Sequence, residues 1–107
     1  MKDGIYFVSF RSSVQDFGNG AVVVRNNVIN GGDYVCTYRG RLTHNSIILT
    51  VEQHNKEGTS VFGNISKFNL LLSVQETGIG YSLNGVVEGM PELKIETQAK
   101  FIGDLIS

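Results

Sequence analysis

The side chains that could perform chemistry in this sequence are few and widely spaced. His44 and His54 are the only histidines, and Glu52 stands two residues before His54, so this pair would share one face of a strand. The pair could supply two ligands to a metal such as zinc, but the local sequence offers no third ligand, whereas structural zinc takes four. Polar residues at a spacing of two are also typical of an exposed strand face. We therefore interpret the pair as surface residues and predict no catalytic residues, no metal and no other cofactor.

The single cysteine and the glycine triplets have structural explanations. Cys36 alternates with Tyr34 and Tyr38, so its thiol is expected beside aromatic rings, where a buried cysteine acts as inert packing. Gly18-Asn19-Gly20 and Gly78-Ile79-Gly80 have the G-x-G pattern of phosphate-binding loops, but neither stands between a strand and a helix as such loops must. Turns explain both triplets. The sequence therefore indicates a protein that is not an enzyme.

The composition argues against several classes of protein. Nine Lys and Arg against ten Asp and Glu give a net charge of −1, so direct nucleic-acid binding is not expected. One cysteine cannot form an internal disulfide, which fits the reducing cytoplasm. The apolar runs reach only about four residues against the roughly 18 of a membrane span, and no signal peptide precedes the first strand. The 107 residues suit a single domain over 1–107.

Segments that alternate between apolar and polar side chains predict a protein built of β-strands. The clearest is Leu93 to Phe101, and Ser46 to His54 repeats the pattern with Ile47, Leu49 and Val51 on one face. Thirteen glycines against one proline supply the turns that many short strands need. We predict strands over residues 5–10, 20–25, 28–30, 34–42, 46–54, 68–75, 79–87 and 93–101.

The connections between these strands indicate how the strands are arranged. No segment has a convincing helical pattern and nearly all connections are short, which excludes parallel crossovers. Asn26-Asn27 and Gly89-Met90-Pro91 end strands, and Lys56 to Ser66 is a long loop whose Val61-Phe62 pair we expect to tuck inward. The predicted fold is all-β, an eight-stranded antiparallel meander barrel, with an open or split sandwich as the alternative.

The first two predicted strands are apolar on both faces. Ile5 and Phe7 alternate with apolar residues, and so do Val22 and Val24. A half-exposed strand needs only one apolar face, so the second face must be covered. We predict that these four residues belong to the interface of a homodimer, since homodimers are the commonest oligomers. The alternative is local cover by the long loop or by a chain terminus.

With the strands in place, several short motifs resemble the GrlR-like family, which is named for a repressor of type III secretion genes in enteric pathogens. The similarity spans nearly the whole chain, and its most specific part is the Gly-Gly-Asp turn followed by tyrosine. The motifs are Asp3-Gly4-Ile5-Tyr6, Gly18 to Gly20, Ile29-Asn30-Gly31-Gly32-Asp33, Tyr38-Arg39-Gly40, Ser60-Val61-Phe62-Gly63 and Ala99-Lys100-Phe101-Ile102.

This resemblance implies a lipocalin-like (calycin-like) barrel that dimerises and acts as a negative regulator by binding a transcription-activator protein rather than DNA. The founding member carries an acidic tetrapeptide in the loop before its I-I-L strand, and that tetrapeptide is implicated in the contact with the activator. The corresponding residues of this chain are Thr43, His44, Asn45 and Ser46, which lack the acidic charges. They are the candidate residues for contact with a partner protein.

The sequence leaves two functions open. The first is a non-enzymatic, cytoplasmic regulatory protein that acts by protein–protein contact. The alternative is a module that binds an apolar small molecule inside the barrel, as eight-stranded lipocalin-type barrels can. The candidate cavity residues for this alternative are Tyr34, Tyr38, Phe68 and Tyr81. Large side chains such as Phe68 could instead fill the interior.

Overall fold

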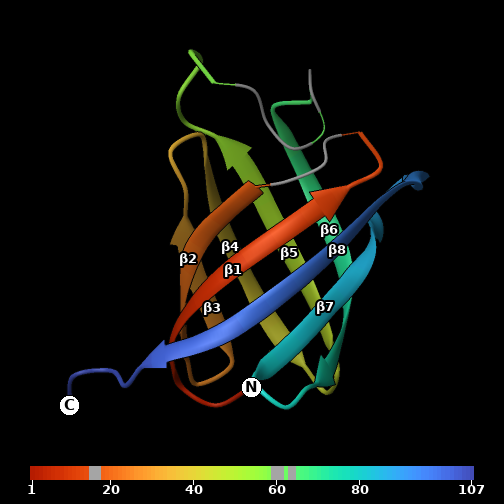
Figure 1. Cartoon of the computed structure of the whole chain (residues 1–107). Coiled ribbons are helices and arrows are strands. Elements are labelled where there is room, and N and C mark those ends of the chain that lie inside the picture. Colours follow the sequence, from red (N-terminus) through yellow and green to blue (C-terminus); the bar gives the residue numbers. More distant parts are fainter. Residues whose placement is uncertain (15–17, 59–61, 63–64) are drawn as a thin grey trace.

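Eight strands close into one barrel in the computed structural model, which describes residues 1–14, 18–58, 62 and 65–107 (Figure 1). Each strand runs antiparallel to its neighbours in the sequence, and the last strand pairs with the first. The described residues contain no helix. This arrangement confirms the predicted all-β meander barrel and excludes the sandwich. The strands are β1 (Gly4–Ser12), β2 (Gly18–Arg25), β3 (Val28–Gly32), β4 (Cys36–Thr43), β5 (Ser46–Gln53), β6 (Lys67–Glu76), β7 (Gly80–Val87) and β8 (Met90–Gly103).

The alternation of side chains along each strand sets the inner and outer faces of the barrel. In β8, Ile95, Thr97 and Ala99 are buried inside, whereas Lys94 and Lys100 are exposed outside. The two faces of this strand are those that the sequence predicts. Pairing of β8 with β1 leaves the sheet without a free edge, and every strand can bury its apolar face in one shared core.

The strand ends follow the local chemistry of the turns. Asn26 and Asn27 have φ angles of 52° and 65°, as the two central residues of a type I′ hairpin turn require, and this turn is confirmed. The start of β8 differs from the prediction, because the strand begins at Met90 and includes Pro91. The β7–β8 register shifts at Val87, and an irregular pairing of this kind accommodates a residue that has no N–H to donate.

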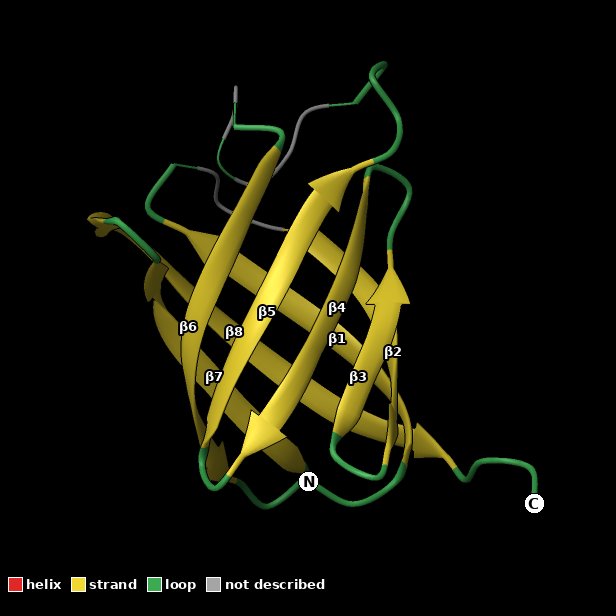
Figure 2. Ribbon diagram, turned by 180° about the vertical axis from the view of Figure 1, so that it is seen from behind, coloured by secondary structure: helices red, strands yellow, loops and turns green. Residues whose placement is uncertain are grey.

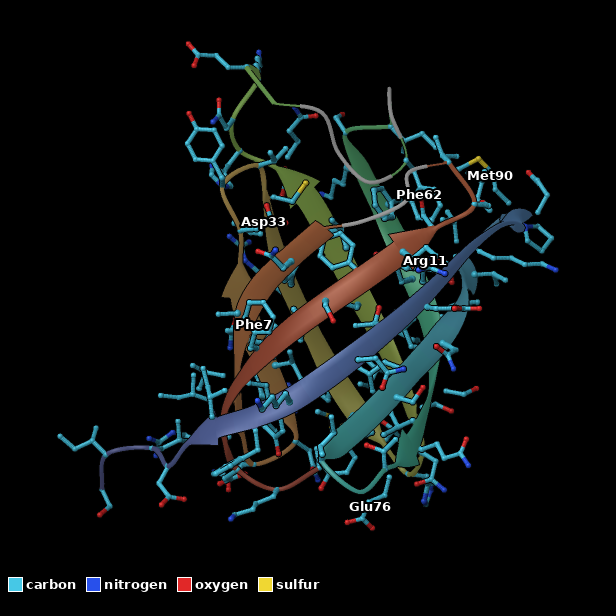
Figure 3. All side chains as sticks on the ribbon, viewed as in Figure 1. Phe7, Arg11, Asp33, Phe62, Glu76 and Met90 are labelled. Carbon is cyan, nitrogen blue, oxygen red and sulfur yellow. The ribbon has the colours of Figure 1, made fainter. Side chains whose placement is uncertain are left out.

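The two ends of the barrel differ. One end carries the short turns β2–β3, β4–β5 and β6–β7 together with both termini (Figures 1 and 2). The other, which we call the loop end, carries the β1–β2, β3–β4 and β5–β6 loops and the short β7–β8 turn. Figure 3 labels Phe62 at the loop end and Glu76 at the turn end. The ring of Phe62 is buried against Phe68 with 5.3 Å between their centroids, so this loop residue tucks inward as predicted. Its predicted companion Val61 lies outside the described residues.

Aromatic rings close the turn end of the barrel. Tyr6 is fully buried, with its ring centroid 5.6 Å from that of Phe101 and 5.9 Å from that of Tyr81. The Tyr6 hydroxyl donates a 2.6 Å hydrogen bond to the carbonyl of Lys2, and the Lys2 ammonium lies 4.3 Å from the centre of the Phe101 ring. We call Tyr6, Tyr81 and Phe101 the floor of the barrel.

Candidate ligand-binding site

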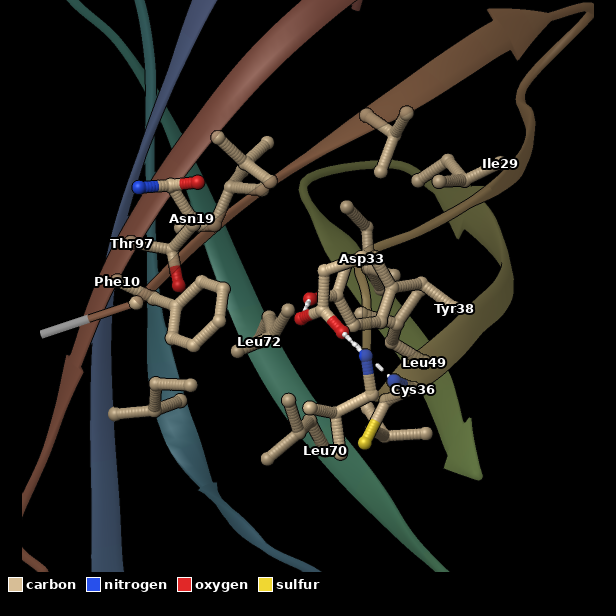
Figure 4. A pocket seen from close by; sticks show the side chains of 18 of the residues that line it. Phe10, Asn19, Ile29, Asp33, Cys36, Tyr38, Leu49, Leu70, Leu72 and Thr97 are labelled. Carbon is tan, nitrogen blue, oxygen red and sulfur yellow. Dashed lines mark hydrogen bonds between the residues drawn. The ribbon is translucent and has the colours of Figure 1, made fainter. Parts of the chain in front are cut away.

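The interior of the barrel contains a cavity of about 280 Å³. All eight strands contribute side chains to its wall, and most of these side chains are aliphatic (Figure 4). Examples are Val22, Ile47, Leu49, Leu72 and Leu83. Space remains because the bulky rings of the floor gather at one end, while smaller side chains line the middle. An eight-stranded barrel of this kind can hold one small ligand.

The cavity reaches solvent at the loop end of the barrel. Tyr34 and Asn19 line the cavity and are both exposed, Tyr34 by 74%. Phe10, near the end of β1, and Asp33, in the β3–β4 loop, line the same region. We call Phe10, Asn19, Asp33 and Tyr34 the mouth. A ligand therefore has an entry path at the mouth.

Asp33 organises the polar part of the mouth. Its Oδ1 accepts hydrogen bonds from the backbone N–H groups of Val35 and Cys36, both 2.7 Å long, and its Oδ2 accepts one from the Tyr38 hydroxyl (Figure 4). Aspartate favours such turns because its side chain bonds to the backbone two or three residues on. The Asp33 N–H donates to the Cys36 carbonyl, and Nε2 of His54 lies 2.9 Å from the Asp33 carbonyl oxygen. The carboxylate is thus held at the edge of an apolar cavity.

Tyr38 and Cys36, which lie beside this carboxylate, are neutral near pH 7. Burial, and then the hydrogen bond to Asp33, raise the pKa of Tyr38 far above its usual range. Burial, and then the negative charge of Asp33, raise the pKa of Cys36 to about 11. The Cys36 thiol is therefore protonated and poorly nucleophilic, which agrees with a packing role.

The raised pKa of Cys36 predicts a loss of stability in alkali. The unfolded chain releases the thiol proton near pH 9, and the native protein only near pH 11. The stabilisation that the protonated Cys36 thiol gives the folded state is therefore complete below pH 9 and is lost as the pH rises through 11. We expect Cys36 to account for about 1 to 3 kcal/mol of the free energy of unfolding lost over this interval. Urea unfolding of the wild type and of Cys36→Ala at several pH values measures this difference. Parallel pH profiles for the two proteins would contradict it.

The structure brings together two of the four predicted cavity residues. Tyr34 and Tyr38 line the cavity. The prediction for Phe68 is wrong, because its ring is covered by Phe62 at the loop end and does not line the cavity. Tyr81 does not line this cavity, because it lies near the start of β7 at the turn end and belongs to the floor with Tyr6.

Two of the four predicted interface residues lie inside the barrel. Val22 and Val24 are 6% and 0% exposed and belong to the core, so their assignment to a surface interface is wrong. The register explains the error, because Val22 pairs with the buried Tyr6 and directly paired residues point to the same side of a sheet. Ile5 and Phe7 do face outward: Ile5 is half-buried, and Phe7, which Figure 3 labels, is 42% exposed.

The other predicted residues lie on the surface. Glu52 and His54 are exposed, and no group of three or more His, Cys, Asp or Glu among the described residues could hold a metal ion. No described helix is long and apolar enough to cross a membrane. The four candidate partner-contact residues are all exposed and form the β4–β5 connection at the turn end: Thr43, His44, Asn45 and Ser46.

Most residues of the site are not identified by the sequence, among them Asp33, Phe10 and Leu49. Asp33 was assigned only to a turn, although an aspartate three residues before Cys36 is the spacing of a side chain that folds back onto the next strand. The sequence predicts the face of β5 on which Leu49 lies, but not that this face meets a cavity. Alternation defines the face of a strand, whereas the position along the barrel axis decides whether a side chain meets empty space.

No protein-family model and no curated protein matches this chain. The class of protein is therefore defined by the fold and the site alone. The chain is an all-β, closed eight-stranded antiparallel barrel, an architecture compatible with lipocalin-like folds, and its interior cavity opens at the loop end.

Proposed function

We propose that this protein binds a small apolar molecule inside its barrel. The observation that carries the proposal is the cavity of about 280 Å³, walled mainly by aliphatic side chains and open at the mouth. Burial of apolar ligand surface against such a wall is the main driving force for binding.

The volume of the cavity limits the size of the ligand. A cavity of about 150 Å³ binds benzene, so the present one suits a ligand of about ten non-hydrogen atoms. A molecule of that size gains enough from burial for a dissociation constant on the order of 0.1 mM. Short-chain alcohols, amines and one- or two-ring compounds are therefore suitable probes.

Native mass spectrometry of freshly purified protein tests this proposal. We expect either a co-purifying small molecule or a saturable one-to-one adduct after addition of 1-octanol. The same experiment on denatured protein serves as a control, because the unfolded chain has no cavity. Absence of both co-purifying ligand and octanol adduct in the folded protein would contradict the proposal.

A second candidate function is regulation by protein–protein contact, which the outer face of β1, β2 and β8 favours. The exposed apolar side chains of this face are Phe7 (42%), Val23 (38%) and Ile102 (56%). Ile5 lies beside Val23, with which it pairs, and its partner in β8 is Gly103, the residue after Ile102. We call Ile5, Phe7, Val23 and Ile102 the outer apolar face. Exposed apolar patches usually mark contact surfaces, and a second copy of the chain is the partner we propose for it. The resemblance to the GrlR-like family would add a transcription activator as a further partner.

Charge on the outer apolar face is expected to dissociate the proposed dimer. Phe7→Asp places a carboxylate on this face, where its desolvation in an interface would be unfavourable. Light scattering at micromolar concentration should give a dimer for the wild type and a monomer for this variant. Val14→Asp, an exposed apolar residue at the loop end, is the matched control and should remain dimeric. A monomeric wild-type protein would refute the proposed dimer.

A further inference from the structure

We propose that the ligand of the barrel carries a protonated amine, which Asp33 binds at the mouth while the apolar part of the molecule occupies the cavity. This inference rests on the proposed function, because it concerns the same cavity. It identifies the chemical class of the ligand as an apolar primary amine rather than a fatty acid or a neutral hydrocarbon.

The charge distribution around the cavity supports this choice. Asp33 is the one charged side chain among the described residues that line the cavity. A ligand with a carboxylate would meet a like charge at the mouth and no Lys or Arg side chain of the described wall. An ammonium group would instead find an opposite charge in a partly desolvated position, where such pairs are strongest.

Asp33 also has hydrogen-bonding capacity left for a ligand. A carboxylate offers about four acceptor positions. Oδ1 accepts two backbone N–H groups, whereas Oδ2 accepts only the Tyr38 hydroxyl among the described groups. The remaining position on Oδ2 can accept a hydrogen bond from an ammonium group. The same bonds hold the carboxylate in a fixed orientation, so little ordering is needed when a ligand binds.

Aromatic rings beside Asp33 add to the attraction for a cation. The rings of Phe10 and Tyr38 meet edge to face with 6.3 Å between centroids, and Tyr34 lines the mouth next to Asp33 in the chain. A cation near the face of an aromatic ring is attracted by the ring quadrupole. A carboxylate with adjacent aromatic rings at the opening of an apolar cavity therefore forms a site suited to an alkylammonium or arylalkylammonium group.

Three probes of equal chain length test the inference on the wild-type protein. We expect isothermal titration at pH 7 to show that 1-aminooctane binds about tenfold or more tightly than 1-octanol, and that octanoate binds more weakly than either. Equal affinities for the amine and the alcohol, or tighter binding of octanoate, would overturn the inference and leave the proposed function standing. If none of the three probes binds, the proposed function itself fails.

Asp33→Asn removes the negative charge of the side chain but can keep the hydrogen bonds that hold the β3–β4 turn. The amide oxygen can keep the bonds to the Val35 and Cys36 N–H groups, and the amide nitrogen can donate to the Tyr38 hydroxyl. We expect this variant to bind 1-aminooctane no more tightly than 1-octanol, and far-UV circular dichroism reports that its barrel is folded. Glu57→Gln removes one negative charge from the exposed β5–β6 loop and should leave the preference intact. An unchanged preference in Asp33→Asn, or an equal loss in Glu57→Gln, would refute the role of Asp33.

Discussion

Leu49→Trp is expected to abolish the binding of 1-octanol. Leu49 points into the barrel from β5 and is only half-buried, because its side chain faces the cavity. An indole at this position would occupy the space that an eight-carbon chain needs, and the affinity should fall by at least about 30-fold. Isothermal titration measures the loss. The free energy of unfolding should change by less than the ~1 to 3 kcal/mol typical of overpacked cores, because empty space is available.

Ile48→Trp is the matched control for this prediction. Ile48 is the preceding residue of the same strand, is 57% exposed and points to the outer face. The substitution adds an indole to β5 without entering the cavity, so octanol binding should be unaffected. If Leu49→Trp binds octanol as well as the wild type does, or if both variants lose binding equally, the ligand does not occupy the interior.

Tyr6→Ala is expected to cause the largest loss of stability. Tyr6 is fully buried between Phe101 and Tyr81 in the floor, and its hydroxyl bonds to the Lys2 carbonyl. Removing a buried aromatic ring costs about 3 to 5 kcal/mol through lost burial and the space left behind. Urea unfolding followed by circular dichroism measures the free energy of unfolding and would show this decrease.

Two further substitutions show how much of this loss is due to the buried ring of Tyr6. Tyr6→Phe keeps the ring and removes only the hydrogen bond, so the expected loss is about 1 kcal/mol. Phe7→Ala removes a ring of similar size from the next residue, which faces outward and is 42% exposed, and should cost clearly less than Tyr6→Ala. Equal losses for Tyr6→Ala and Phe7→Ala would show that the floor does not support the barrel.

The fold was predictable because its determinants are local in the sequence. Leu93 to Phe101 alternates so regularly that the inner and outer faces of β8 follow directly from the pattern. The pair Asn26-Asn27 defines a tight hairpin, since asparagine tolerates the positive φ values that the turn requires. Short connections of this kind, repeated along the chain, permit few arrangements other than a meander.

The surface and the cavity were less predictable because they depend on pairing and on depth within the barrel. Both faces of β2 are apolar, so alternation alone could not decide whether Val22 or Val23 points outward; the pairing of Val22 with Tyr6 decides it. Tyr38 and Tyr81 both point inward, but one lies at the cavity and the other in the floor. Asp33 becomes a site residue only because the β3–β4 loop folds its carboxylate over the mouth.

The central claim, that the barrel interior binds an apolar molecule, is tested most directly by methyl NMR during titration with 1-octanol. The predicted result is a saturable shift of the inward methyl groups of Val22, Leu49 and Leu72, while those of the outward Ile48 and Leu71 stay in place. Shifts confined to Ile48 and Leu71, or no saturable shift of any inward methyl group, would contradict the claim.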